Sequence, residues 1–133
     1  RRFRIRELDD SKPYLIGHVE PLREFVFEET PDATILVRRA QTAFETWFSI
    51  VLSRQDLAIK VQFPADWTAL SFAIANLLPL DNLEKQRFLE STDTLERFEE
   101  LIPIIEDQIL QSAATPMHER VHVAELSEWI TPN

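Results

Sequence analysis

The spacing of apolar residues changes at Thr30, and this change limits the folds open to the chain. Between residues 36 and 52, apolar side chains recur at intervals of three and four, which is the spacing of one face of an α-helix. Thr30 suits the capping position of such a helix, Pro31 its first turn, and Asp32 the positive end of the helix dipole. We therefore predict a long amphipathic helix from Pro31 to about residue 54.

The residues before this helix follow the alternation of a β-strand instead. Residues 1–8 (RRFRIREL) read as one strand, with Phe3 and Ile5 on one face and Arg2, Arg4 and Arg6 on the other. Residues 14–19 (YLIGHV) read as a partner strand. The polar residues 9–13 (DDSKP) predict the turn of a β-hairpin. Pro21 closes the second strand, because its nitrogen has no hydrogen to donate. A lone hairpin is marginally stable in water, so we expect further strands upstream of Arg1.

Two shorter helices are predicted after the long one. Pro64 opens the first of them, which is apolar on nearly every side, and Pro79 ends it. Asp81 or Asn82 caps the next, with the sequence LEKQRFLE. Residues 55–63, ahead of Pro64, are compatible with either a loop or a short strand.

The last predicted helix has an unusual interior residue. Thr92 or Asp93 caps it, and apolar residues recur along it at helical spacing. Pro103 lies well inside and removes one backbone hydrogen bond, which predicts a kink or a division into two helices. The residues that follow Ala113 are apolar without one clear period, and we expect them to dock on the rest of the protein.

These elements predict an α+β fold in one domain-sized chain of 133 residues. We assign residues 1–30 to strands, residues 31–113 to a four-helix bundle-like subdomain and residues 114–133 to a C-terminal segment. An aromatic stripe in the long helix fits either a binding groove or the core, and burial in the core is the usual role of such a face. The stripe consists of Phe44, Trp47 and Phe48.

Composition excludes several classes of function. Lys and Arg number 14 against 23 Asp and Glu, and the net charge of −9 repels nucleic-acid phosphates. Gly17 is the single glycine, whereas a Walker A or GxGxxG loop needs at least two. The absence of cysteine excludes disulfides and a thiol nucleophile, and it fits the reducing cytoplasm. No apolar run approaches the roughly 20 residues of a membrane span, so we expect no membrane partner, and no motif indicates a cofactor.

One stretch contains the letters of a zinc-hydrolase motif. His118 and His122 lie four apart in HERVH, and Glu119 follows the first, which gives the string HExxH. Such a site needs a regular helix, whereas Pro116 precedes the string and Val121 favours extended structure. A metal-dependent hydrolase that uses these residues is therefore our alternative reading, and we assign no catalytic or metal-binding residue in the main one.

Two stretches together resemble the LON domain, the N-terminal substrate-binding domain of the ATP-dependent Lon protease. Residues 1–22 (RRFRIRELDDSKPYLIGHVEPL) are similar to its strand, turn and strand ending in V-E-P-L. Residues 75–109 (ANLLPLDNLEKQRFLESTDTLERFEELIPIIEDQI) resemble its L-x-L-x-x-x-x-KQ-x-L-L-E and D-x-x-x-R-L stretch in order and spacing. The resemblance covers essentially residues 1–110.

The resemblance implies a fold and a role. The hairpin would be the end of a β-rich PUA-like barrel whose first part lies upstream, and residues 31–113 would be the helical subdomain. The ATPase and protease modules of Lon do not follow, so we expect a free-standing, non-enzymatic domain. The family role implies binding of unfolded or tagged client proteins through apolar surface, with a separate protease as a further partner.

The expected binding region is the join between barrel and helices. Candidate contacts are Tyr14, His18, Phe25 and Phe27, which lie near the hairpin and at its exit toward the helices. A third reading is a structural or oligomerisation domain, in which residues 121–130 exchange between copies to form a homo-oligomer.

Overall fold

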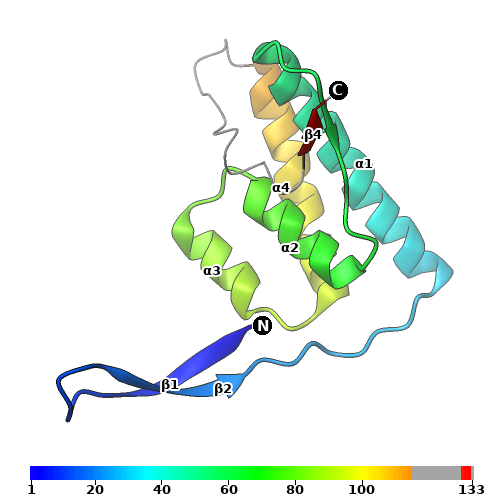
Figure 1. The fold of residues 1–133 in the computed structure, drawn as a ribbon. Coiled ribbons are helices and arrows are strands. Elements are labelled where there is room, and N and C mark those ends of the chain that lie inside the picture. The colour runs from blue at the N-terminus through cyan, green and yellow to red at the C-terminus, as the bar shows by residue number, and fades with distance from the viewer. Residues whose placement is uncertain (115–129, 133) are drawn as a thin grey trace.

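The computed structural model describes residues 1–114 and 130–132 (Figure 1). A hairpin of two strands is followed by four helices, so the predicted α+β class is confirmed. A second pair of short strands forms a separate small sheet. In chain order the elements are β1 (Phe3–Asp9), β2 (Ile16–Pro21), α1 (Pro31–Arg54), β3 (Ile59–Val61), α2 (Trp67–Leu77), α3 (Asn82–Glu90), α4 (Thr94–Ala114) and β4 (Ile130–Pro132).

The hairpin pairs β1 with β2 in antiparallel register, from Phe3 opposite Pro21 to Asp9 opposite Ile16. An irregularity between Ile5 and Glu7 shifts the register along β1. The second strand begins two residues later than predicted. In the connection between the strands, the carboxylate of Asp9 accepts a hydrogen bond from the Ser11 amide (2.9 Å).

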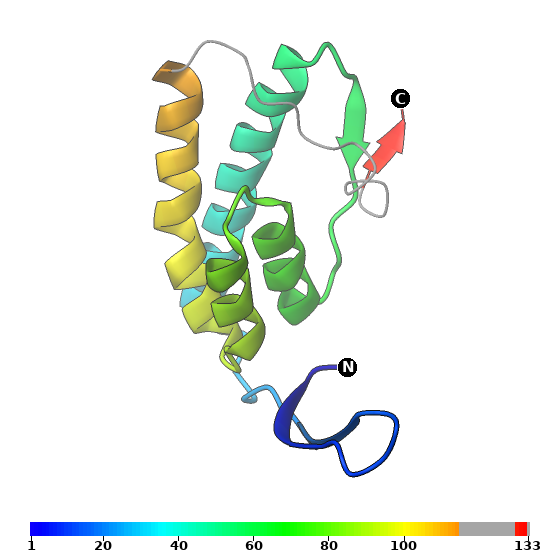
Figure 2. The ribbon, with the colours of Figure 1, turned by 90° about the vertical axis from the view of Figure 1, so that its left-hand side faces the viewer.

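The long helix α1 has the predicted bounds. The hydroxyl of Thr30 accepts a hydrogen bond from the Ala33 amide (3.1 Å), and Pro31 occupies the first turn. The aromatic stripe is core, since Phe44, Trp47 and Phe48 are all buried. Figures 1 and 2 show α1 and α4 running side by side in the same direction.

The start of α2 differs from the prediction. The helix begins at Trp67, because the carboxylate of Asp66 accepts a hydrogen bond from the Ala69 amide (2.8 Å) and acts as the cap. Pro64 therefore lies outside the helix, in the connection from β3. At the other end α2 stops at Leu77, ahead of Pro79 as predicted.

Two capping residues were predicted for α3 and two for α4. In both helices the aspartate of the pair is the cap. Asp81 caps α3 in a reciprocal capping box with Glu84. The carboxylate of Asp93 accepts a hydrogen bond from the Glu96 amide (3.0 Å) at the start of α4. Pro103 does not divide α4 into two helices. Buried residues on both sides of it hold the helix against the core: Leu101, Ile102 and Ile105.

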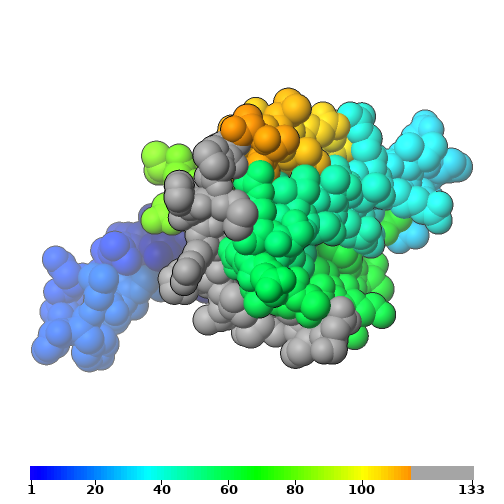
Figure 3. Space-filling view, turned by 90° about the horizontal axis from the view of Figure 1, so that it is seen from above, coloured from blue at the N-terminus to red at the C-terminus, as the bar shows by residue number. Residues whose placement is uncertain are grey.

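Residues 55–63, which were compatible with a loop or a short strand, contain β3. This strand pairs antiparallel with β4. The HERVH string, with His118, Glu119 and His122, lies outside the described residues, and so does most of the segment expected to exchange between copies. The hydrophobic core lies among α1, α2, α3 and α4. Figure 3 shows the hairpin reaching beyond the outline of these helices.

Candidate functional site

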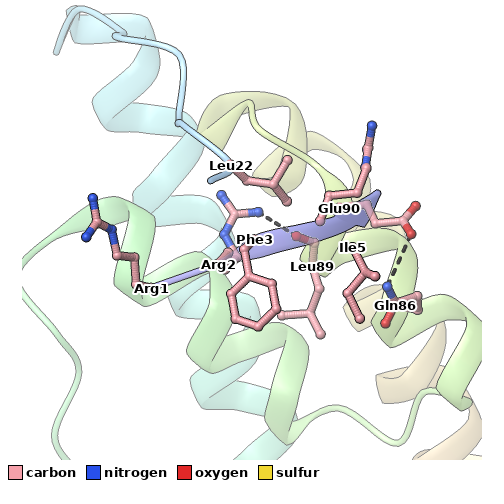
Figure 4. A pocket seen from close by; sticks show the side chains of 9 residues that line it. Arg1, Arg2, Phe3, Ile5, Leu22, Gln86, Leu89 and Glu90 are labelled. Carbon is pink, nitrogen blue, oxygen red and sulfur yellow. Dashed lines mark hydrogen bonds between the residues drawn. The ribbon is translucent and has the colours of Figure 1, made fainter. Parts of the chain in front are cut away.

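Two adjoining cavities mark the surface where the hairpin meets the helices. The first has a volume of about 470 Å³ and lies between β1 and α3. Figure 4 shows the side chains of Phe3 and Ile5 pointing from β1 toward Leu89 and Gln86 of α3. Its walls combine apolar and charged side chains, from Arg1, Arg2, Phe3, Arg4, Ile5, Leu22, Gln86, Leu89 and Glu90.

The second cavity has a volume of about 420 Å³ and lies between α2 and α3. Its walls are mainly aliphatic and aromatic, from Ala69, Phe72, Ala73, Ala75, Asn76, Lys85, Phe88 and Leu89. Leu89 lines both cavities, so they adjoin at this residue. We call the residues that line the two cavities the join surface.

The wall that α3 contributes follows from helical spacing. Successive residues of an α-helix point about 100° apart. Phe88 is therefore buried in the core at 2 % exposure, while the neighbouring Leu89 remains 48 % exposed. The Nζ of Lys85 donates a hydrogen bond to the Asn76 carbonyl (3.0 Å), which ties α3 to the end of α2.

Apolar exposure extends from the join surface along the hairpin. Phe3 and Ile5 are 57 % and 55 % exposed, and Leu8 and Val19 are exposed to a similar degree.

A buried arginine lies beneath this surface. Arg97 of α4 is fully buried, and its Nε donates to the Ser71 hydroxyl (2.9 Å). Its Nη1 donates to the Ser91 carbonyl (2.9 Å) and to the carboxylate of Glu24 (3.3 Å). Its Nη2 donates to the Thr94 hydroxyl and to the carboxylate of Glu24, both at 3.0 Å. Burial is therefore accompanied by a full set of acceptors, as a charged group in a protein interior requires.

Burial also affects the acid–base properties of Arg97. Desolvation lowers the pKa of its guanidinium to about 10, against the opposing influence of the Asp93 carboxylate. At neutral pH the side chain therefore carries its positive charge. This charge lies over the ring of Phe72, 4.0 Å from the ring centroid.

Arg2 joins the same group of side chains from the hairpin side. Its guanidinium forms an ion pair with Glu24 and donates hydrogen bonds to the carbonyls of Leu89 and Ser91. It also lies 4.5 Å from the centroid of the Phe72 ring. Desolvation and the nearby charge of Arg97 lower the pKa of Arg2. Two guanidiniums, which share the Glu24 carboxylate, thus lie against a ring that forms part of the join surface.

The four predicted contact residues lie apart from these cavities. Tyr14 is 61 % exposed in the hairpin turn, and His18 is exposed on β2, opposite Glu7. Phe25 is 67 % exposed in the connection to α1, where its amide donates to the Thr92 carbonyl (2.8 Å).

Phe27, the fourth predicted contact, is half-buried in the same connection. Its ring stacks on Trp67 with 5.7 Å between the ring centroids. The hairpin thus carries one pair of the predicted residues and the connection carries the other, and neither pair lines the join surface.

Sequence reasoning missed Glu24 and Arg97. The position of Arg97 carried a usable signal, because it falls on the face of α4 that otherwise holds Phe98, Leu101 and Ile105. An arginine on a buried helix face requires a partner. Nothing in the sequence near Glu24 indicates that it is this partner, since 73 positions separate the two residues.

Residues 1–114 and 130–132 hold no group of three His, Cys, Asp or Glu side chains arranged to bind a metal ion. Within these residues no helix combines the length and apolar character needed to cross a bilayer.

The family assignment rests on one comparison. A family model for the ATP-dependent protease La (LON) substrate-binding domain matches residues 1–107. Searches of curated proteins and of solved structures found no match. The matched range contains the hairpin, the connection to α1 and most of the helices, including every residue of the join surface. The chain therefore belongs to the family of LON substrate-binding domains.

Proposed function

We propose that this domain binds exposed apolar segments of protein substrates at the join surface, without carrying out chemistry on them. The observation that carries the proposal is the apolar cleft between α2 and α3, which continues past Leu89 toward β1. The substrate-binding role of the family also supports this proposal. Binding in this proposal depends on shape and apolar contact.

The cavities have a suitable size for side chains of a bound segment. Ligand pockets in proteins typically measure about 300–1,000 Å³, and each of the two cavities falls within this range. Burial of one leucine or phenylalanine side chain contributes about 1.5–3 kcal/mol. Two neighbouring cavities therefore suit a segment with two apolar side chains, as an unfolded chain exposes them.

The proposed partners are unfolded or client proteins, with a separate protease as a further partner. A protein interior exposes its apolar side chains when it unfolds, so an apolar cleft distinguishes the unfolded form from the folded one. The cysteine-free composition supports a reducing compartment, and we propose the cytoplasm.

The test compares two substitutions on the same helix. Leu89→Gln removes an apolar side chain from both cavities, and Leu83→Gln changes an exposed leucine of α3 that lines neither. We expect Leu89→Gln to weaken binding of an unfolded test protein about tenfold or more, since a buried leucine contributes about 1.5–3 kcal/mol. Leu83→Gln should leave the affinity close to that of the parent protein.

Fluorescence anisotropy measures both affinities with a labelled test protein in its unfolded and folded forms. Preference for the unfolded form, lost in Leu89→Gln alone, supports the proposal. Equal binding of the two forms, or equal effects of the two substitutions, would rule out the join surface as the site of substrate recognition.

A further inference from the structure

The hairpin is attached to the helices over a small area. The extensive packing of the described residues lies within the hairpin and among the helices, rather than between the two. Both strands are largely exposed to solvent. Among the described residues, the contacts between the hairpin and the helices therefore lie near the base of the hairpin.

Two of these contacts involve Glu24, which belongs to neither part, while Arg2 also donates directly to the carbonyls of Leu89 and Ser91. Glu24 follows β2 in the connection to α1, and its carboxylate pairs with Arg2 on one side and Arg97 on the other. Arg2 lies next to the start of β1, whereas Arg97 lies on α4. One carboxylate thus joins an arginine at the base of the hairpin to an arginine fixed inside the helices.

Arg97 is held much more firmly than Arg2. It is fully buried, and its acceptors on α2, on α4 and in the turn after α3 fix the plane of the guanidinium. A planar guanidinium with several bound N–H groups has one orientation available to it. Arg97 therefore presents its remaining N–H groups to Glu24 from a fixed position.

The same arginine reaches the join surface through Phe72. The ring of Phe72 lines the cavity between α2 and α3, and it lies under both guanidiniums. Arg2 also donates to the carbonyl of Leu89, the residue shared by the two cavities. The contacts that hold the hairpin are thus the contacts that shape the cavity walls.

We propose that Arg97 is a positioning residue, which fixes the hairpin against the helices through Glu24 and thereby sets the geometry of the join surface. Its effect on substrate affinity rests on the proposed function, whereas its effect on the placement of the hairpin does not. If the ion pair is lost, the hairpin samples a range of orientations while the helices remain folded.

The experiment measures a distance between the two parts. The chain has no cysteine, so Ser11→Cys in the hairpin turn and Ser49→Cys on α1 provide two unique sites for spin labels on exposed residues. Double electron–electron resonance then gives the distribution of distances between them. We expect one narrow distribution in the parent protein and a broader one when Glu24→Gln is added.

A matched control is available in the hairpin itself. Glu20→Gln removes the carboxylate of an exposed pair with Arg6 that lies within the hairpin, so it should leave the distribution unchanged. Because Glu24→Gln leaves Arg97 buried without its counter-charge, a second variant combines it with Arg97→Gln and removes both charges. This double variant should broaden the distribution as well.

Circular dichroism confirms in each case that the helices are folded at the temperature of the measurement. If the ion pair only stabilised the fold, its removal would lower the thermal midpoint and leave the distance distribution of the folded variant as narrow as that of the parent protein. That result would overturn the proposal. Binding of the unfolded test protein is then measured separately, so absence of binding in the parent protein bears on the proposed function and not on the positioning role.

Discussion

At the scale of single residues, the join surface depends on side chains that differ in kind from those of the core. The core residues are apolar and need little more than volume and burial, as Phe44 and Phe98 show. Arg97 instead combines full burial, a charge and specific acceptors. A single substitution there changes the electrostatic state of the interior as well as its packing.

The hairpin turn provides a pH-dependent test at this scale. Hydrogen bonds from Ser11 lower the pKa of Asp9 below its ordinary value of 3.8. A carboxylate whose pKa is lowered in the folded state stabilises that state at pH values above the ordinary pKa. This stabilisation is lost as the pH falls through the lowered pKa of the folded state. We expect the NMR shift of the Ser11 amide to titrate with a midpoint below 3.8.

Asp9→Asn serves as the control for this titration, because the amide cannot ionise. The Ser11 shift should then show no such transition. A midpoint at or above the ordinary value in the parent protein would contradict the turn geometry described for the hairpin.

At the scale of secondary-structure elements, α3 matters most for the proposed site, although it is the shortest of the helices in the described part of the chain. It has 9 residues and one side chain buried in the core, Phe88. Its ends therefore contribute much of its stability, since short helices are marginal without capping. The capping box of Asp81 and Glu84 supplies this capping at the N-terminal end of α3.

Removal of the cap gives a prediction for α3. Asp81→Ala should lower the free energy of unfolding by about 1 kcal/mol, because the Glu84 amide loses its acceptor. Asn82→Ala, one position later, leaves the capping box in place and should change the free energy by less than about 0.5 kcal/mol. Urea denaturation followed by circular dichroism measures both, and equal effects of the two substitutions would argue against the cap.

The elements also show where sequence reasoning succeeds. The bounds of α1 were predictable because its cap, its proline and its apolar spacing all lie within the helix or next to it. The start of α2 was missed, because Pro64 and Asp66 give competing local signals and only the hydrogen bond to Ala69 decides between them. Binding at the join between strands and helices stays a prediction, and the residues that line the two cavities were not predicted. Its cavities arise from the placement of β1 against α3, which no local pattern specifies.

At the scale of the whole molecule, charge separates the proposed function from nucleic-acid binding. The chain carries a net charge of −9, although four of its first six residues are arginines. Arg2 and Arg6 are already paired with carboxylates of the same molecule, which reduces what these arginines offer to an external phosphate. The summed field of the protein therefore opposes the approach of a polyanion.

We accordingly predict no binding of a fluorescent single-stranded oligonucleotide, even at low salt. Anisotropy at increasing protein concentration provides the measurement, with a basic protein as the positive control. Binding that weakens steeply as salt is added would contradict this prediction, because such salt dependence is typical of contacts with phosphates.

The Arg97–Glu24 pair also has a consequence for folding kinetics. The two residues are 73 positions apart, so their pairing requires closure of a long loop. Contacts of this kind form after local helices, and an interaction that is absent from the folding transition state mainly slows unfolding. The pair is therefore expected to lengthen the lifetime of the attached hairpin and to have little influence on how fast the helices assemble.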